Sequence, residues 1–393
     1  MPAAVHARVG LSYAALVGSH AGLAFLPGVL AADGLDGATI PRVLLAGSLA
    51  AAAAGPWWAD QADRRGERAP FLAPLAGLAA LLTLGMLWAD EPLAWAALLI
   101  VWNAVRAGPG PILDAQTLGL LGTRRDVYPR LRAWGSLAYL LGVLLTGVLA
   151  AGNPGVPPLV TAGALAVGAW ALAGVPEAPP TPQPKVDWRA MLRDPVLRTL
   201  ALAVALHGVT MSSYDHLFTL VVQERGHAPW VASAAIVGGV VAEIGVLRSG
   251  DRLLAFATPK TWLAVAMASG LIRWPLTALA PDAGSLVALQ SLHGVGFGLF
   301  WLAAVRVFDD AAPAGRSASA QSLLVVATYG VGRVTAMLAA SLALDVVSLG
   351  TWFGALALFS AAAVVATLAT PVRTVRTATE GALLATVDDD RLS

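Results

Sequence analysis

The segment Pro176–Asp194, PEAPPTPQPKVDWRAMLRD, contains five prolines, mixed charges and no apolar run. It is the one linker in a chain that is otherwise a series of apolar stretches, and about 20 residues of each stretch suffice to cross a membrane as a helix. Six such runs precede it, near residues 9–31, 41–59, 70–89, 94–118, 130–151 and 157–175. Six more follow, near 197–222, 229–248, 258–280, 284–307, 317–342 and 349–370. The linker therefore divides twelve predicted helices into six and six.

Composition supports membrane insertion. Hydrophobic residues make up 57% of the 393 residues and charged residues only 12%, too little charge to cover a soluble protein of this size. A soluble all-helical core would need helices with a polar face, which most of these segments lack. Residues Val9–Leu30 are long enough to be a retained first membrane helix rather than a signal peptide.

The charge balance and the cysteine count exclude several classes of partner. A net charge of +1 gives no reason to expect nucleic acid. With no cysteine there is neither a disulfide framework nor a thiolate metal site, and His293 alone is a weak metal signal. There is no Walker loop, zinc-protease motif or nucleophile elbow, so we expect no enzyme, cofactor or metal.

Basic residues predict the orientation, because Lys and Arg accumulate in short cytoplasmic loops. The loops after the second, fourth, sixth, eighth and tenth helices hold Arg64, Arg65, Arg68, Arg124, Arg125, Lys185, Arg189, Arg193, Arg248, Arg252, Lys260 and Arg316. The opposite loops hold Arg42 and Arg225 only, with acidic residues at Asp90, Glu91, Asp282 and Asp345. We therefore expect both termini in the cytoplasm, Arg8 near one and Arg373 and Arg376 near the other, around a multi-pass protein of the cytoplasmic (inner) membrane.

Ionisable residues within the predicted spans are the candidate functional groups. An ionised side chain in mid-membrane costs about 2.5–3.5 kcal/mol on insertion scales, so each is a functional hypothesis unless it merely pairs two helices. The set comprises Arg106, Asp114, Arg132, Asp215, Glu243, Arg273, His293 and Arg333. Its positive and negative members are nearly balanced, which fits a water-lined centre in which they neutralise one another.

Two loops and one cluster of helices resemble a known family. The loop Asp63-Arg64-Arg65-Gly66-Glu67-Arg68 resembles the conserved cytoplasmic loop of the major facilitator superfamily, with Glu67 as a departure, and Gly250-Asp251-Arg252 echoes it weakly in the second half. More specific are the stretches YPRLRAWGS (128–136), VAEI (241–244), LIRW (271–274) and LHGVGFGLF (292–300). Together they are similar to the branch of phenylpropionate and nucleoside proton symporters and, more distantly, lactose permease.

This resemblance implies a role for most of the candidates. Asp114 and Arg132 match residues that bind substrate from helices 4 and 5, and Glu243 matches the helix 8 carboxylate that contacts substrate and helps couple protons. Arg273 and His293 match an arginine and a histidine of the coupling network. Asp215 and Arg333 match a charge pair between helices 7 and 11, which we expect to be mainly structural. Asp63, Arg64, Gly66 and Arg68 would form the conformational-switch loop.

Departures from the lactose permease pattern limit the transfer. Gly296 replaces a carboxylate central to proton release, and Gln290 replaces a lysine. Proton coupling would therefore run through Glu243, Asp114 or Asp215, if it exists. Arg106 has no counterpart and is a candidate for substrate binding, as are Glu243 and Arg273.

The expected fold is an all-α integral membrane protein with two pseudo-symmetric six-helix bundles, 1–175 and 196–372, a cytoplasmic linker at 176–195 and a cytoplasmic tail at 373–393. The expected function is proton-coupled uptake of a small polar or aromatic solute by alternating access, carried out by a monomer in the lipid bilayer. An exporter of the same fold would show the same features. A nontransporting sensor or assembly factor would not need Glu243 and Arg273 inside the membrane.

Overall fold

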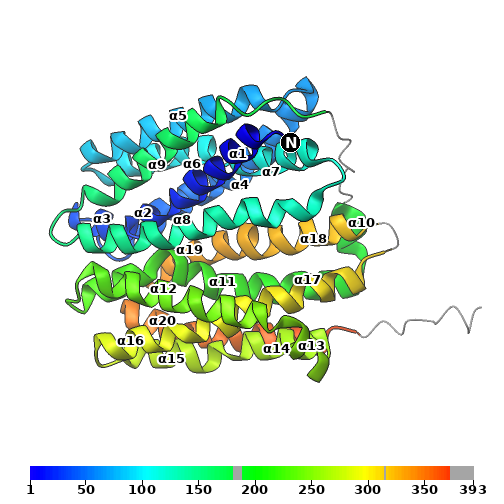
Figure 1. Cartoon of the computed structure of the whole chain (residues 1–393). Coiled ribbons are helices and arrows are strands. Elements are labelled where there is room, and N and C mark those ends of the chain that lie inside the picture. The colour runs from blue at the N-terminus through cyan, green and yellow to red at the C-terminus, as the bar shows by residue number, and fades with distance from the viewer. Residues whose placement is uncertain (180–187, 314–315, 372–393) are drawn as a thin grey trace, which may run out of the picture.

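A computed structural model describes residues 1–179, 188–313 and 316–371, and every regular element among them is helical (Figure 1). Residues 180–187 of the predicted linker and the whole predicted tail, 373–393, lie outside the described residues. We call residues 1–179 the N-terminal half and residues 188–371 the C-terminal half. In Figure 1 the first half, coloured blue to green, lies above the second, coloured green to red.

The N-terminal half crosses six times. The elements are α1 (Ala3–Gly18), α2 (His20–Leu23) and α3 (Leu26–Ala32) in crossing 1, α4 (Thr39–Arg65) in crossing 2, α5 (Ala69–Gly85) in crossing 3, α6 (Pro92–Arg106) and α7 (Pro109–Leu121) in crossing 4, α8 (Tyr128–Leu149) in crossing 5 and α9 (Val156–Leu172) in crossing 6. Short 3₁₀ turns at Met86–Trp88 and Arg125–Val127 follow α5 and α7.

The C-terminal half begins with the short α10 (Trp188–Arg193) and then also crosses six times. Crossings 7 and 8 are α11 (Pro195–Glu224) and α12 (Pro229–Arg248), followed by the short α13 (Gly250–Phe256). Crossing 9 is α14 (Pro259–Ala268) with α15 (Gly270–Leu279), and crossing 10 is α16 (Ala283–Leu289), irregular turns at Gln290–Leu299 and α17 (Phe300–Ala311). Crossing 11 is α18 (Ser317–Val325), a π-helical segment at Val326–Val331 and α19 (Gly332–Ala343), and crossing 12 is α20 (Leu349–Ala369).

Ten of these crossings are long and apolar enough to span a membrane. Val156–Leu172 is apolar but shorter, and Thr39–Arg65 is long but ends in the charged loop that joins it to α5. Helix ends follow local sequence signals: the Asp194 side chain accepts hydrogen bonds from the backbone N–H groups of Val196 and Leu197, with Pro195 as the first helical residue of α11.

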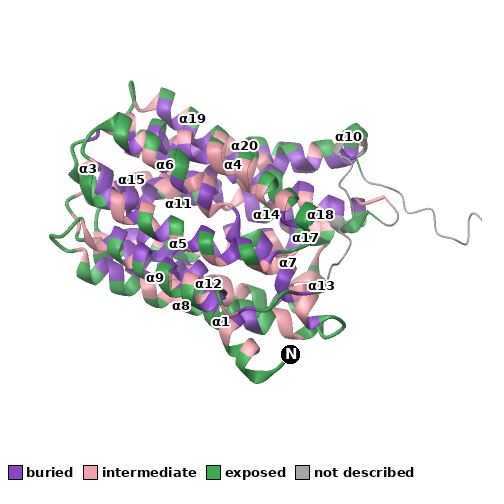
Figure 2. Cartoon of the chain, turned by 90° about the horizontal axis from the view of Figure 1, so that it is seen from above, coloured by how far each residue is buried: buried purple, intermediate pink, exposed green. Residues whose placement is uncertain are grey.

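The outer surface is that of a protein solvated by lipid. Large apolar side chains are exposed on many of the helices, among them Leu81, Leu145, Trp170, Leu202, Leu342 and Leu358. Exposed and buried residues alternate along the helices in Figure 2, so each helix has one face toward its neighbours and one outward. An aqueous protein rarely exposes so much contiguous apolar surface.

The halves contact each other at one end, which we call the closed end; it carries α3 and the turn between α11 and α12. Here the Thr219 hydroxyl donates to the carbonyl of Ala24 (2.8 Å) and the Ser233 hydroxyl to that of Val143 (2.8 Å). Arg42 forms an ion pair with Asp345. Among the described residues, all hydrogen bonds and ion pairs that join the halves lie at this end.

Close helix packing at the closed end depends on Gly147 in α8. A Cβ added there would collide with Ser233 on α12 and would lie 3.2 Å from the carbonyl oxygen of Pro229. The backbone of α12 cannot yield as a flexible side chain could. The two halves therefore approach closely here because position 147 carries no side chain.

Replacing Gly147 with isoleucine should force the closed end apart. The chain contains no cysteine, so spin labels on Asp33→Cys and Val346→Cys report a single distance across this end. We expect Gly147→Ile to move the label distance distribution to longer values. Gly163→Ile is the matched control, because a Cβ at Gly163 meets no atom within 4 Å. An unchanged distribution in Gly147→Ile would contradict this reading of the packing.

Candidate functional site

Helix interruptions lie beside most of the candidate residues. His20 follows the break between α1 and α2, Arg106 is the last residue of α6, and Arg273 lies in the first turn of α15. His293 sits within the irregular turns of crossing 10, and Arg333 follows the π-helical segment of crossing 11. Pro109 explains the break in crossing 4, since it has no N–H for the helix ladder. Such interruptions are tolerated at membrane depth where they line a cavity or are buried in protein.

A first cluster lies in the N-terminal half around Asp114 on α7. Arg132 on α8 donates from NH1 to Oδ1 of Asp114 at 3.3 Å. The hydroxyls of Tyr13 and Tyr128 also donate to that oxygen, at 2.8 and 2.9 Å, and the two rings meet edge to face. The Arg132 side chain is 54% exposed, so its guanidinium has room for a further partner. The structure thus brings Asp114 and Arg132 together as expected.

A second cluster in the C-terminal half links four side chains from three crossings. Oε2 of Glu243 on α12 is 3.7 Å from Nε2 of His293, and Nδ1 of His293 is 3.5 Å from NH1 of Arg273. Oε1 of Gln290 accepts two hydrogen bonds from Arg273, one from Nε at 3.2 Å and one from Nη2 at 2.6 Å. Arginine only donates, so Nδ1 of His293 is the acceptor and its Nε2–H points toward Glu243.

Glu243 and Arg273 do not form a direct ion pair. The imidazole of His293 stands between them, and the nearest acceptor for the guanidinium is the neutral amide of Gln290. The geometry follows from crossing 10, in which glycines bring the helix against α12. A Cβ at Gly298 would lie 3.1 Å from Cγ of Glu243.

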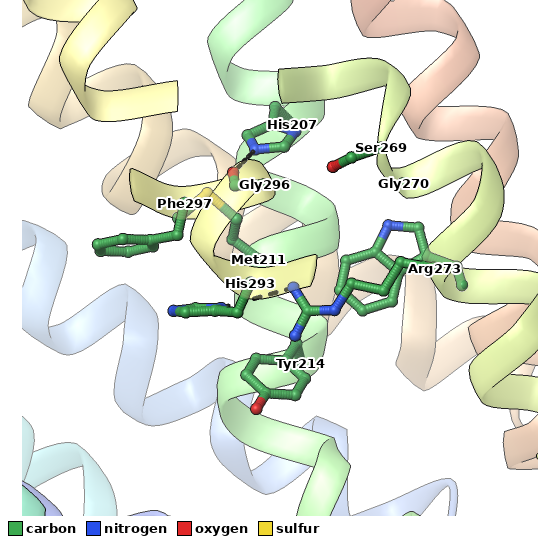
Figure 3. A pocket seen from close by; sticks show the side chains of 10 residues that line it. His207, Met211, Tyr214, Ser269, Gly270, Arg273, His293, Gly296 and Phe297 are labelled. Atoms are coloured by element: carbon green, nitrogen blue, oxygen red, sulfur yellow. Dashed lines mark hydrogen bonds between the residues drawn. The ribbon is translucent and has the colours of Figure 1, made fainter. Parts of the chain in front are cut away.

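Arg273 is buried with only 3% of its surface exposed and lines a cavity of about 10 Å³, room for about one water molecule (Figure 3). Its guanidinium lies 4.3 Å from the Tyr214 ring centre and 4.5 Å from that of Trp274. Nε2 of His207 donates to the carbonyl of Gly296 at 2.8 Å. A Cβ at Gly296 would be 3.8 Å from NH1 of Arg273, so a longer side chain here would reach it.

Asp215 and Arg333 do not form the expected ion pair in this conformation. They interact electrostatically, but the ion pairs among the described residues do not include them. Asp215 is exposed although it lies in the middle of the long helix α11. Nε of Arg333 is buried without a hydrogen-bond partner. The pair is therefore separated here, and solvent-accessible surface reaches its carboxylate.

The loop after α4 is built as a compact turn. Gly66 has φ +68°, a backbone conformation that side chains disfavour, and Arg68 forms an ion pair with Asp63 at 3.0 Å. Glu177, which follows α9, accepts hydrogen bonds from the backbone N–H groups of Arg68 and Ala69 at 2.7–3.0 Å. Arg64 pairs with Asp60 on its own helix. The loop is thus fastened to the end of crossing 6.

Several polar residues of the site were not predicted from the sequence. Tyr13 contacts Asp114, Gln290 satisfies Arg273, and His207 bonds the backbone of crossing 10. His20 and His216 lie within electrostatic range of Arg106 and Arg333. Counting every histidine within an apolar span, and not His293 alone, would have found His20, His207 and His216. Within the described ranges no three His, Asp or Glu side chains gather as a metal site.

In the part of the chain that the structure describes, twelve crossings surround buried charges, as in transporters of the major facilitator type, and comparisons with known proteins identify the family. It belongs to the MFS_1 like family, whose sequence profile matches residues 13–355. It is 24% identical over 306 residues to the maltose permease of Geobacillus stearothermophilus, covering 76% of this chain and 77% of the permease. It is 26% identical over 240 residues to a probable 3-phenylpropionic acid transporter of Escherichia coli strain K12, covering 56% and 60%.

Solved structures agree on the fold. A variant of the nucleoside transporter NupG superposes with a TM-score of 0.82 at 15% identity, covering 93% of this chain and 99% of that one. The xylose transporter XylE of E. coli, in an inward open conformation, gives a TM-score of 0.68 at 13% identity over 97% and 99%. At these identities the likeness establishes the fold alone. The predictions of an all-helical membrane fold, of the superfamily and of a non-enzymatic protein are confirmed.

Replacing Gln290 with leucine should destabilise the protein, because Arg273 would stay buried without its two shortest hydrogen bonds. Hydrogen bonds to charged groups contribute about 1.5–3 kcal/mol each, so we expect a loss of about 2 kcal/mol or more, read as a lower Tm of the purified protein. Gln321→Leu is the control, since Gln321 makes one neutral hydrogen bond to the carbonyl of Val305. Equal shifts in both variants would show that Gln290 has no special task.

Proposed function

We propose that this chain takes up a small polar or aromatic solute by alternating access, driven by proton movement. The observation that carries the proposal is the row of three side chains Glu243, His293 and Arg273. In this row one imidazole lies between a titratable carboxylate and a permanent positive charge. A purely structural arrangement would place the carboxylate directly on the arginine. The names of the two relatives, a maltose permease and a probable 3-phenylpropionic acid transporter, fit a small solute.

The distribution of basic loops assigns the N-terminal end to the cytoplasm of an inner membrane. The closed end then faces outward, and the conformation is inward-facing. Asp114 and Arg132, 33% and 54% exposed, would be reached from the cytoplasmic side. Both termini would be cytoplasmic, and a monomer suffices because every proposed contact lies within one chain.

The proposed coupling step uses the approach of the His293 imidazole to Glu243, whose Nε2 and Oε2 atoms are 3.7 Å apart. In the inward-facing state the imidazole N–H faces the carboxylate, and a donor of this kind favours the ionised form. When α12 and crossing 10 separate, the carboxyl loses that donor and is more stable with a proton taken from the outside. Return to the inward-facing state restores the donor and releases the proton to the cytoplasm.

The two bundles, 1–175 and 196–372, are proposed to rotate about the substrate, with the linker 176–195 between them and a local movement of crossing 10 away from α12 inside the second bundle. Asp63, Arg64, Gly66 and Arg68 would act as the conformational-switch loop, since Glu177 fastens that loop to the start of the linker. Substrate would be held by Asp114 and Arg132 from one half and by Glu243, Arg273 and Arg106 around it. His293 would serve proton coupling, and Asp215 with Arg333 would pair in another state of the cycle.

Two other functions share parts of this picture. An exporter would use the same fold, and the proton gradient would drive the substrate out of the cell. A nontransporting sensor would need neither the titratable carboxylate of Glu243 beside His293 nor the interrupted crossings. We favour uptake because the relatives that match at the sequence level include a permease.

Neutralising Glu243 should separate exchange from accumulation. With a substrate first found by a thermal-shift screen of small solutes, Glu243→Gln in proteoliposomes should abolish uphill uptake driven by a pH gradient, because no carboxylate can carry the proton, while exchange across the membrane continues. Glu224→Gln is the control, since Glu224 is an exposed residue at the end of α11. Uphill uptake at the wild-type rate in Glu243→Gln would rule out this assignment.

Neutralising Asp114 should weaken substrate binding at least tenfold. The Asp114→Asn side chain would no longer hold Arg132 by charge, and the hydroxyls of Tyr13 and Tyr128 would lose an ionised acceptor, each a loss of the order of 1 kcal/mol or more. Titration calorimetry with the same substrate measures the effect. Asp126→Asn, an exposed neighbour in the next loop, should bind normally. Full affinity in Asp114→Asn would remove Asp114 from the binding site.

A further inference from the structure

The charged residues inside the membrane do not balance. Arginines outnumber carboxylates four to three, with Arg106, Arg132, Arg273 and Arg333 against Asp114, Asp215 and Glu243. Asp114 forms an ion pair with Arg132. The other two carboxylates, Asp215 and Glu243, lie in the C-terminal half with Arg273 and Arg333. The unmatched charge is therefore that of Arg106. An uncompensated cation at this depth is costly, and that cost is relieved by an anionic partner.

Arg106 has no protein partner that could supply this charge. It ends α6, and its guanidinium carbon lies 5.0 Å from the ring centre of Trp102 on the same helix. One terminal nitrogen is buried without a hydrogen-bond acceptor. No described carboxylate is in ion-pair distance of it, and the charged side chain with which it interacts electrostatically is another cation, Arg333.

Arg333 approaches from the opposite half, on α19. It also has a buried, unsatisfied N–H, at Nε, and its nearest carboxylate, Asp215, is not in ion-pair contact. Two guanidiniums from opposite halves thus lie within electrostatic range of each other, and each has a buried donor without a partner. Guanidinium donors match a carboxylate in geometry and charge, and a planar fork can bind it through two parallel hydrogen bonds.

Two histidines complete the surroundings. Nδ1 of His20 lies 3.1 Å from the carbonyls of Leu16 and Val17, and Nδ1 of His216 lies 2.9 Å from that of Ser212. A carbonyl only accepts, so each Nδ1 carries the proton and each Nε2 is left for another partner. Both rings interact electrostatically with both arginines. His20 is exposed, so surface accessible to solvent reaches this group of four side chains.

An aromatic wall adjoins the pair on the C-terminal side. The rings of Tyr329 and Trp301 stack with centres 5.6 Å apart, and Trp301 meets Phe297 edge to face at 6.3 Å. Tyr329 interacts electrostatically with Arg333 and lies three residues before Gly332, the first residue of α19, so this ring of the wall and the guanidinium belong to the same crossing. The wall is half-buried rather than sealed. It offers apolar contact to a body that extends from the charged group.

We propose that Arg106 and Arg333 bind the carboxylate of a small organic anion between the halves, with an aromatic or other apolar body lying against Phe297, Trp301 and Tyr329. The proposal rests on the transport function above and gives its substrate class. One carboxylate would neutralise the excess charge, and it would attract both halves to the same ligand. A proton on Glu243 together with one bound monoanion leaves the net charge equal to that of the empty carrier, so the loaded carrier meets no added charge penalty.

The test compares carboxylates with their neutral amides. Purified full-length protein in detergent is titrated with benzoate, phenylacetate and 3-phenylpropionate, each beside the corresponding amide, and Tm and Kd are measured. We expect at least one acid to bind at least tenfold more tightly than its amide. Arg106→Gln and Arg333→Gln should each weaken that acid at least tenfold and weaken its neutral amide much less, so that the ratio of the two affinities falls. Arg106→Lys and Arg333→Lys retain the charge and should recover part of the affinity.

Arg248→Gln, an exposed end residue of α12, is the matched control and should bind as wild type. Equal affinity for all acids and amides, or acid binding that survives both glutamine variants, would overturn the anion site. Acid binding that depends on Arg106 without uptake in proteoliposomes would support the site and contradict the transport proposal. Uptake of a neutral solute driven by a pH gradient and unaffected by Arg106→Gln would support the transport proposal and contradict the anion site.

Discussion

Arginine keeps its charge at any depth in a membrane, and the interior of this protein is arranged around that fact. The four arginines of the membrane-spanning crossings differ in the groups that surround their guanidiniums. Arg132 has a carboxylate and two tyrosines nearby, and Arg273 has an amide and two aromatic rings. Arg333 interacts electrostatically with a carboxylate that is not in ion-pair contact with it. Arg106 has an aromatic ring alone.

Interrupted helices make this arrangement possible. A continuous helix satisfies its backbone but fixes side chains at 100° intervals, whereas a π-turn inserts a residue and rotates everything after it. In crossing 10 the irregular turns and their glycines let the helix lie against α12, so that His293 comes between Glu243 and Arg273. In crossing 11 a second π-helical segment precedes Arg333. Both irregular segments lie in the half that holds the proposed proton-coupling groups.

Much of the fold could be predicted from the sequence because apolar length is a strong signal. The run at 229–248 coincides with α12, and the predicted end of the second run at residue 59 was wrong only because α4 continues through charged residues to Arg65. The partnership of Asp114 and Arg132 was predictable from the family resemblance and because either charge is costly to leave unpaired within the membrane. The intervening His293 was not, since spacing in sequence gives neither the π-turns nor the rotation they cause. His20 and His216 were missed because the candidates within the spans were restricted to formally charged residues and His293.

The contacts of the closed end are weak for an interface that must open. The ion pair between Arg42 and Asp345 is about half exposed, and pairs of this kind contribute about 0–1 kcal/mol and are screened by salt. The rest is helix packing at small residues and three hydrogen bonds to backbone carbonyls, from Thr219, Ser233 and Arg42. A difference of 1 kcal/mol changes a population ratio about fivefold. Ionic strength alone should therefore alter the fraction of molecules that are open to the outside, and the resting occupancy of the two states would vary with the salt content of the surrounding medium.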